Sequence, residues 1–365
     1  MKKTNVRRNI FLWALYNFAN TPITIAMGGL FLAQWVVLDN KFDDIWYGAT
    51  FTLATIALLI TSPFLGAWSD GVGRRMPFLK WTTYIQAIVG LLLGIVAVSG
   101  IATIPKVIIV LVLFFFLQYF YQISLIFYNA LLDVLSTSSD RGRVSGITET
   151  ADNIGWLIAP ALLLPFALGI ITIFGSPGRA QVFLPAVIIF IITGLPMIIW
   201  FKEPKLKTIS PKVDFKGVYK DTIDGFRLLI RKEKNVTLFL VSFMFVSDAL
   251  LTASLYFAIY LDRVFKISDI QKYLALALLE ITVILSAYVA GKIADKFGYK
   301  KVLLLSCVIL TLVYGLISVT SSLLFIYVLC AFVGLGYGGF YTVSRAMLIN
   351  ISPPSRLGEY FGFYS

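Results

Sequence analysis

Two carboxylates interrupt long apolar stretches of the sequence, Asp248 near the middle of one and Glu280 near the middle of the next. Ionisable side chains inside membrane-spanning segments are costly and mark ion or substrate pathways. Neither has a Lys or Arg at a matching depth in the sequence, so a low-dielectric environment is expected to leave each one protonated part of the time. Asp248 and Glu280 are therefore candidates for proton or ion coupling. The alternative is that each acid donates one structural hydrogen bond to a neighbouring helix.

Polar side chains recur at helical spacing in two other apolar stretches. Between residues 17 and 24 they lie three or four positions apart, and between 118 and 133 they share one helix face. Their amides and hydroxyls suit a small polar or zwitterionic solute, whereas the alternative is hydrogen bonding between helices. Arg345 adds a cation for an anionic group of the solute, or else anchors its helix end at the membrane interface. The candidate substrate path consists of Asn17, Asn20, Thr24, Gln118, Gln122, Asn129, Tyr341 and Arg345.

The chain contains no histidine, which excludes Ser-His and Cys-His catalytic pairs, the HExxH zinc site and haem ligation by histidine. No Walker sequence is present, so ATP is not expected to drive the protein directly. Its two cysteines, Cys307 and Cys330, lie in apolar runs and are interpreted as packing residues. We therefore predict no enzyme activity, no catalytic residue, no bound metal and no cofactor, with a proton or sodium gradient as the driving force.

The composition places these residues in a membrane. Of 365 residues, 59% are hydrophobic and 14% are charged, and the mean hydropathy is +0.86, whereas soluble domains carry about 25% charged residues. A spanning helix needs about 20 apolar residues, and continuous rather than alternating runs favour helices over a barrel. Ten such runs occur, at 10–37, 46–68, 79–100, 104–134, 144–172, 180–201, 236–261, 272–293, 302–320 and 322–350.

The distribution of positive charge predicts the orientation. With a cytoplasmic N-terminus, most of the 31 Lys and Arg residues fall in inner segments, as the positive-inside rule requires. This asymmetry explains the net charge of +12 without a nucleic-acid or nucleotide partner. The predicted partners are membrane lipid and one small-molecule substrate, the predicted state is a monomer, and the short loops favour a prokaryotic plasma membrane.

One long polar stretch, at 202–235, divides the chain into three predicted regions. Within this stretch, residues 216–232 are expected to form an amphipathic helix on the cytoplasmic side. The regions are a six-helix transmembrane half over 1–201, a basic cytoplasmic linker over 202–235, and a half with four helices over 236–365.

A ten-residue element is repeated in the two halves. GAWSDGVGRR at 66–75 and GKIADKFGYK at 291–300 align with an offset of 225 residues. The glycines allow close helix packing and a tight turn, the aspartate can accept hydrogen bonds from a helix N-terminus, and the basic residues anchor the inner face. Repeated six-helix halves are typical of transporters. The element contributes Gly66, Asp70, Gly73, Arg74 and Arg75 in the first half and Gly291, Asp295, Gly298 and Lys300 in the second.

The same offset predicts where the next helix begins. Applied to the fifth run, an offset of 225 places the eleventh helix near residue 369, beyond Ser365. We therefore expect about ten helices of a set of twelve, with the last two absent from the chain. The alternative is a protein of ten helices.

Five charged residues lie near the inner ends of the fourth and fifth runs. They are expected to form a cytoplasmic gate of ion pairs that break and reform as the halves rock. Surface pairs of this kind contribute about 1 kcal/mol or less, so a solvated helix end is the alternative. The candidate gate residues are Asp133, Arg141, Arg143, Glu149 and Asp152.

Several segments along the chain together resemble one known family. They are WALYNFANTPIT at 13–24, SPFLGAWSDGVGRRMPFL at 62–79, FYNALL at 127–132 with RGRVSG at 141–146, and GYGGFYTVSRAM at 336–347 followed by EYFGFYS at 359–365.

These segments are similar to the vacuole effluxer family of the major facilitator superfamily, whose loop signature the repeated element also resembles. The resemblance implies an all-α transmembrane bundle, secondary transport by alternating access and, for the fungal members, amino-acid efflux. It also implies a path lined by the first, fourth, seventh and tenth helices, which include both polar stripes, Asp248 and Arg345. The sequence departs from the family at Asn17, where the family has Asp, at residues 21–23, and at Tyr341, near a usual Gln.

The predicted function is therefore a secondary active transporter for a small, amino-acid-like solute, working by efflux and coupled to protons. Two alternatives stay open. One is a sugar or glycoside:cation symporter of the same superfamily. The other, from a different class, is a non-transporting membrane sensor or assembly partner that works through the linker.

Overall fold

The computed structural model describes residues 3–203, 231–267 and 269–364. In these residues every regular element is a helix, and ten helices are long and apolar enough to span a membrane. The ten predicted spans are confirmed, with ends that differ from the prediction by a few residues. The helix predicted over 216–232 lies almost wholly outside the described residues.

The helices follow one another with mostly short connections. The first half contains α1 (Lys3–Ile23), η1 (Thr24–Gly29), α2 (Leu30–Gln34), η2 (Trp35–Asp39), α3 (Asp44–Val72), α4 (Met76–Val98), α5 (Thr103–Ala130), α6 (Leu132–Leu135), α7 (Arg141–Ala167), η3 (Arg179–Val182) and α8 (Phe183–Trp200). The second half contains α10 (Lys234–Tyr260), η4 (Leu261–Phe265), α11 (Asp269–Phe297), α12 (Tyr299–Val319), α13 (Leu323–Ile351), η5 (Pro354–Arg356) and α14 (Leu357–Tyr364).

The repeated element ends one helix and begins the next in each half. Gly73 follows the last residue of α3, and its φ of 66° is left-handed and favours glycine. Pro77 lies in the first turn of α4, where a backbone donor is not needed. Gly298, with a φ of 96°, separates α11 from α12. Both glycines therefore lie where any other residue would strain the turn.

The first membrane span is not one continuous α-helix. It widens to a π-helix at η1 and again at η2, and π turns are frequent at functional sites. Two adjacent glycines, Gly28 and Gly29, end η1. Tyr47 of α3 donates a hydrogen bond to the Gly28 carbonyl (3.0 Å), so a neighbouring helix holds this break in place.

Apolar side chains cover the outside of the bundle as well as its core. Leu59 and Ile60 of α3 are 74% and 72% exposed, and a bilayer solvates such a surface. Inside the first half, the rings of Trp13 and Tyr16 stack on Tyr128 at centroid distances of 4.9 and 5.6 Å. Trp13 and Tyr128 also donate to each other's backbone carbonyls. This packing fixes α1 against α5.

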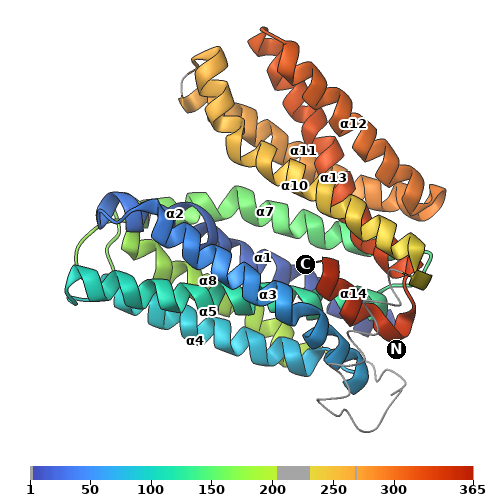
Figure 1. The fold of residues 1–365 in the computed structure, drawn as a ribbon, viewed down its shortest axis with the longest axis horizontal. Helices are drawn as coiled ribbons and strands as arrows, with labels where there is room; N and C mark the ends of the chain where they lie inside the picture. Colours follow the sequence, from blue (N-terminus) through green and yellow to red (C-terminus); the bar gives the residue numbers. More distant parts are fainter. Residues whose placement is uncertain (1–2, 204–230, 268, 365) are drawn as a thin grey trace.

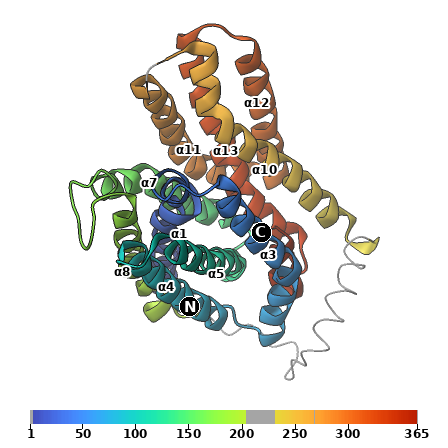
Figure 2. The same cartoon turned by 60° about the vertical axis from the view of Figure 1, so that its left-hand side comes forward.

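The two halves meet at one end and diverge toward the other. Figure 1 shows α10 to α13 leaning away from the first half, and Figure 2 shows the same arrangement from another side. At the contact end, Gly142 of α7 lies against Gly291 of α11, and Gly66 of α3 lies against Gly358 of α14. A Cβ at Gly142 would come within 2.5 Å of the Gly291 carbonyl oxygen, so glycine is what permits this close approach.

α14 begins earlier than the constant offset predicted. It starts at Leu357, and its counterpart α7 starts at Arg141, so these helices are related by an offset of 216 residues. The prediction that the eleventh helix begins near residue 369 was wrong. The reason is that the path from the repeated element to this helix is nine residues shorter in the second half.

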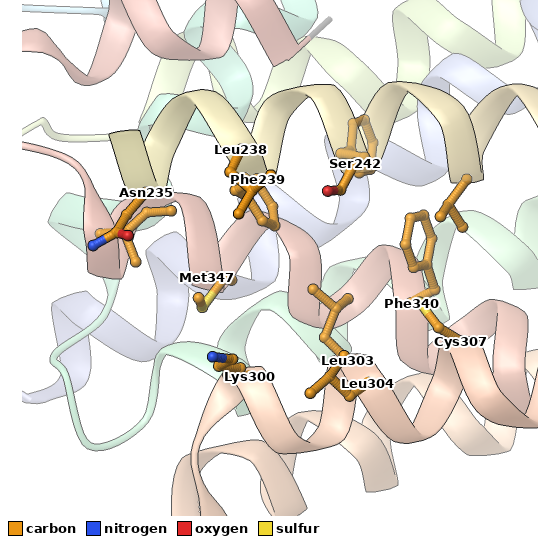
Figure 3. A pocket seen from close by; sticks show the side chains of 13 residues that line it. Asn235, Leu238, Phe239, Ser242, Lys300, Leu303, Leu304, Cys307, Phe340 and Met347 are labelled. Atoms are coloured by element: carbon orange, nitrogen blue, oxygen red, sulfur yellow. The ribbon is translucent and has the colours of Figure 1, made fainter. Parts of the chain in front are cut away.

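An apolar groove lies between α10, α12 and α13 (Figure 3). It has a volume of about 420 Å³, and Phe239, Leu303, Phe340 and Lys300 are among its lining residues. In the first half, α8 packs against α1 and α4, which are the counterparts of α10 and α12. The groove therefore occupies the position that α8 fills in the first half.

Candidate functional site

A buried ion pair joins the two halves. The guanidinium of Arg345 on α13 donates to Glu149 on α7 (Nη2–Oε2 2.5 Å) and to Asn129 on α5 (Nη1–Oδ1 3.4 Å). Arg345 is 6% exposed, and its Nε has no hydrogen-bond partner among the described residues. A buried arginine with a free donor is suited to an anionic group, provided that Glu149 gives way. The alternative role as an interface anchor does not fit a guanidinium buried between the halves.

Polar side chains of α1 face α7. Asn17 Nδ2 donates to a backbone carbonyl of α7 (3.0 Å), and Thr21 Oγ1 donates to Asp152 Oδ1 (3.0 Å). Asn20 and Thr24 donate to backbone carbonyls one turn earlier in their own span (3.0 and 3.1 Å). Asn17 thus makes a hydrogen bond between helices, which is the alternative to a role in the substrate path. Thr21 brings Asp152 to the side of α1.

The polar stripe of α5 and the aromatic side chains of α13 supply the other candidate residues of the substrate path. Gln118 is 7% exposed, with its amide oxygen beside η1, and Gln122 is half-buried. Asn129, at the end of the stripe, reaches the central ion pair. Tyr341 packs on Tyr337 with a centroid distance of 4.7 Å. Of these candidates, the structure places Asn129 in direct contact with Arg345.

Glu280 faces the first half where α7 and α11 pack together. The helices are antiparallel, and Thr150 Oγ1 of α7 donates to the Ile284 carbonyl of α11 (3.2 Å). One turn from Ile284, Glu280 lies within electrostatic range of Asp152. Its Oε2 is buried and has no hydrogen-bond partner in the part of the chain that the structure describes. Two carboxyl groups from opposite halves therefore lie near each other across this contact.

Asp248 has different surroundings from Glu280. It is exposed on α10, on the helix face opposite to the buried Leu250 and Phe257. The structure therefore does not bring the two predicted coupling residues together.

Each aspartate of the repeated element binds the N-terminus of a helix from the other half. Asp70 accepts from the backbone N–H groups of Gly358 and the next residue, at the start of α14 (2.9 and 3.1 Å). Asp295 accepts from those of Gly142 and the next residue, at the start of α7 (2.7 and 2.8 Å). A carboxylate is favoured there because these amides have no partner within the helix and the helix dipole is positive at that end.

The basic residues of the two elements differ in their surroundings. Arg75 is 2% exposed and pairs with the aspartate of its own element (3.3 Å), whereas Arg74 is exposed. Lys300, the counterpart of Arg75, is exposed and lines the apolar groove. In the second element the Tyr299 hydroxyl donates to the aspartate instead (3.1 Å).

The five predicted gate residues do not form one network. Arg141 pairs with Asp133 (3.0 Å), and the exposed Arg143 pairs with Asp140 (3.5 Å) at the start of α7. Glu149 belongs to the central ion pair and Asp152 to the contact with α1. The prediction of a single network was wrong for these two residues, because α7 rises about 1.5 Å per residue and carries them away from its N-terminal end.

Glu203 is a structural residue that the sequence analysis missed. Its carboxylate accepts from the backbone N–H groups of Arg75 and Met76 at the start of α4 (2.8 and 2.9 Å). It lies 128 and 127 residues away in sequence, so no local capping pattern could reveal it. The available signal was an acidic residue directly after the sixth span.

Replacing Asp295 by Ala is expected to lower the free energy of unfolding by about 1–2 kcal/mol, because two backbone donors of α7 lose their acceptor. Asp70→Ala is expected to act similarly on α14. Unfolding of the purified protein in mixed micelles measures both. Asp43→Ala is the matched control, because Asp43 precedes α3 without a side-chain hydrogen bond to it. An equal loss in this control would contradict the capping role.

Comparison with known proteins places this geometry in context. Residues 14–365 match the model of one protein family, the Major Facilitator Superfamily. No curated protein matches the chain.

Three solved structures resemble the chain over nearly its whole length. They are a bacterial homologue of the iron transporter ferroportin in an outward-facing state (TM-score 0.72, 14% identity, 99% of this chain and 88% of that one), the proton:xylose symporter XylE bound to 6-bromo-6-deoxy-D-glucose (0.73, 12%, 100% and 86%), and the human organic anion transporter MFSD10 (0.72, 15%, 100% and 90%). At these identities the likeness establishes the fold alone.

Proposed function

The chain belongs to the Major Facilitator Superfamily and is a multi-pass membrane transporter of the secondary type, and from this premise we infer its solute and its driving ion. We propose that it moves a small, polar, amino-acid-like solute out of the cell by alternating access, coupled to protons. The resemblance of residues 13–24 and 336–347 to the vacuole effluxer family supports the choice of solute.

The ion pair between Arg345 and Glu149 is the observation that carries this proposal. It joins α13 to α7 and thus one half to the other. A solute carboxylate that binds Arg345 must displace Glu149, and so weakens a contact that holds the halves together. Solute binding is then linked to their rearrangement, because a ligand shifts a conformational equilibrium by its difference in affinity for the two states. The amides and hydroxyls of the proposed path, including Asn129, would bind the rest of the solute.

Glu280 is the proposed proton site. Its Oε2 is buried without a partner among the described residues, and Asp152 adds a second negative charge within electrostatic range. A proton relieves this repulsion in the return step, when the halves close without the solute. Asp248 stays the second candidate, supported by the acidic position in the seventh helix of the family that the sequence resembles.

Reconstitution of the protein into proteoliposomes that contain a pH dye tests the proposal. A pool of amino acids is expected to drive proton movement, and a pool of sugars is not. The Arg345→Gln variant in matched liposomes is the control for leak. Proton movement with sugars alone would favour a sugar or glycoside symporter. Silence of the folded protein with both pools, in the presence and absence of sodium, would favour a sensor or assembly partner.

A further inference from the structure

A second cavity opens at the end of the first half that lies opposite to the repeated elements. Its volume is about 520 Å³, within the range of about 300–1,000 Å³ typical of ligand sites. The walls come from the last residues of α4 and α7, the first turn of α5, η2 with its Trp35, and the segment 176–180. None of its lining residues belongs to the central site.

The cavity carries an excess of positive charge. Lys106 and Arg179 line it, and Asp39 is the one acid among its lining residues. Arg179 already pairs with Asp39 and donates to Gln34 Oε1 (3.0 Å). Lys106 makes no ion pair with any residue that the structure describes. One positive charge is therefore left for an anionic ligand.

The segment beside the cavity is apolar and exposed. Leu168, Ile170 and Phe174 are 65%, 74% and 65% exposed, and Leu168 also lines the cavity. Such a surface is suited to the hydrocarbon of a lipid.

The backbone of this apolar segment is satisfied from inside the protein. Gln181, which is 1% exposed, accepts from the N–H groups of residues 173 and 174 (3.0 and 3.4 Å) and donates to the carbonyls of residues 174 and 176. Irregular backbone in contact with lipid needs internal partners, because no water is present to supply them. The segment is therefore built for contact with the membrane.

We propose that this cavity binds the phosphate of an anionic phospholipid whose acyl chains lie against residues 168–174. A lysine binds phosphate through charge-assisted hydrogen bonds. Lys106 supplies the unpaired charge, and Ser99, Asn40 and Ser176 line the cavity with uncharged polar groups for the glycerol part. A soluble anion would use the same cation but gain nothing from the apolar segment.

Titration of the delipidated protein with phosphatidylglycerol in neutral mixed micelles tests the proposal, with native mass spectrometry as the readout. Lys106→Gln is expected to weaken binding about fivefold, the effect of one lysine near an anionic membrane surface. Lys106→Arg is expected to restore binding. Ile170→Ser is expected to weaken binding of the lipid but not of inorganic phosphate.

Lys41→Gln is the matched control, because Lys41 is an exposed lysine at the same end that does not line the cavity. An equal loss in this variant would reduce the effect to general surface charge and overturn the proposal. Inorganic phosphate that bound as tightly as the lipid, with the same dependence on Lys106, would identify a soluble anion as the ligand. Equal binding of phosphatidylcholine would also contradict the proposal.

Discussion

Replacing Arg345 by Gln is expected to reduce the initial rate of solute transport in proteoliposomes by at least about 100-fold. The substitution leaves Glu149 buried without its cation, which costs about 3–5 kcal/mol. It also removes the group proposed to hold the anionic end of the solute. Arg345→Lys is expected to recover only part of the rate, because lysine lacks the planar fork that reaches Glu149 and Asn129 together.

The double variant R345Q/E149Q separates binding from folding. With both charges replaced by amides, the midpoint of thermal unfolding is expected to return close to the wild-type value, because no unpaired charge stays buried. Transport is expected to stay lost. Wild-type transport by the double variant would show that the pair stabilises the protein without binding the solute.

Replacing Glu280 by Gln is expected to uncouple transport from protons. Glutamine resembles the protonated carboxyl at every pH, so solute exchange across the membrane should continue. Accumulation driven by a pH difference should fall at least about tenfold, because the proton no longer distinguishes the two states. In the wild type the rate should rise as the pH falls, and in the variant it should be flat. Initial rates of exchange and of pH-driven accumulation measure the two effects separately.

Asp248→Asn is the matched variant on α10. Asp248 is exposed and does not contribute to the described contacts of the central ion pair, so this variant is expected to keep the pH dependence of the wild type. A flat profile in Asp248→Asn, with a normal profile in Glu280→Gln, would move the coupling site to α10. Glu280 would then be a structural acid.

The membrane spans were predictable because each needs only its own run of apolar residues. The repeated element was equally visible, and its aspartates bind helix N-termini because glycines bring the neighbouring backbones close. The prediction of one ion-pair network failed because it grouped residues by their closeness in sequence. Glu149 and Asp152 follow Arg141 by only 8 and 11 residues, but in a helix this separation is two to three turns.

The pairing of residues across the halves could not be predicted from the sequence. Arg345 and Glu149 are 196 residues apart, and no periodicity within one helix shows which helix lies opposite. The start of α14 at Leu357 was missed for a related reason. One offset was applied to a repeat whose helices and connecting segments differ in length between the halves.

The π turns give the first span a place where its length can change while its register is kept. Each π turn holds an additional residue compared with an α-helical turn. Deleting one residue between 24 and 29 would therefore restore an α-helical turn and leave the residues beyond it facing the same way. A deletion within α2 would instead rotate the residues beyond it by about 100° and turn Asp39 away from Arg179. Over evolution, single insertions and deletions in this span should therefore occur at its π turns.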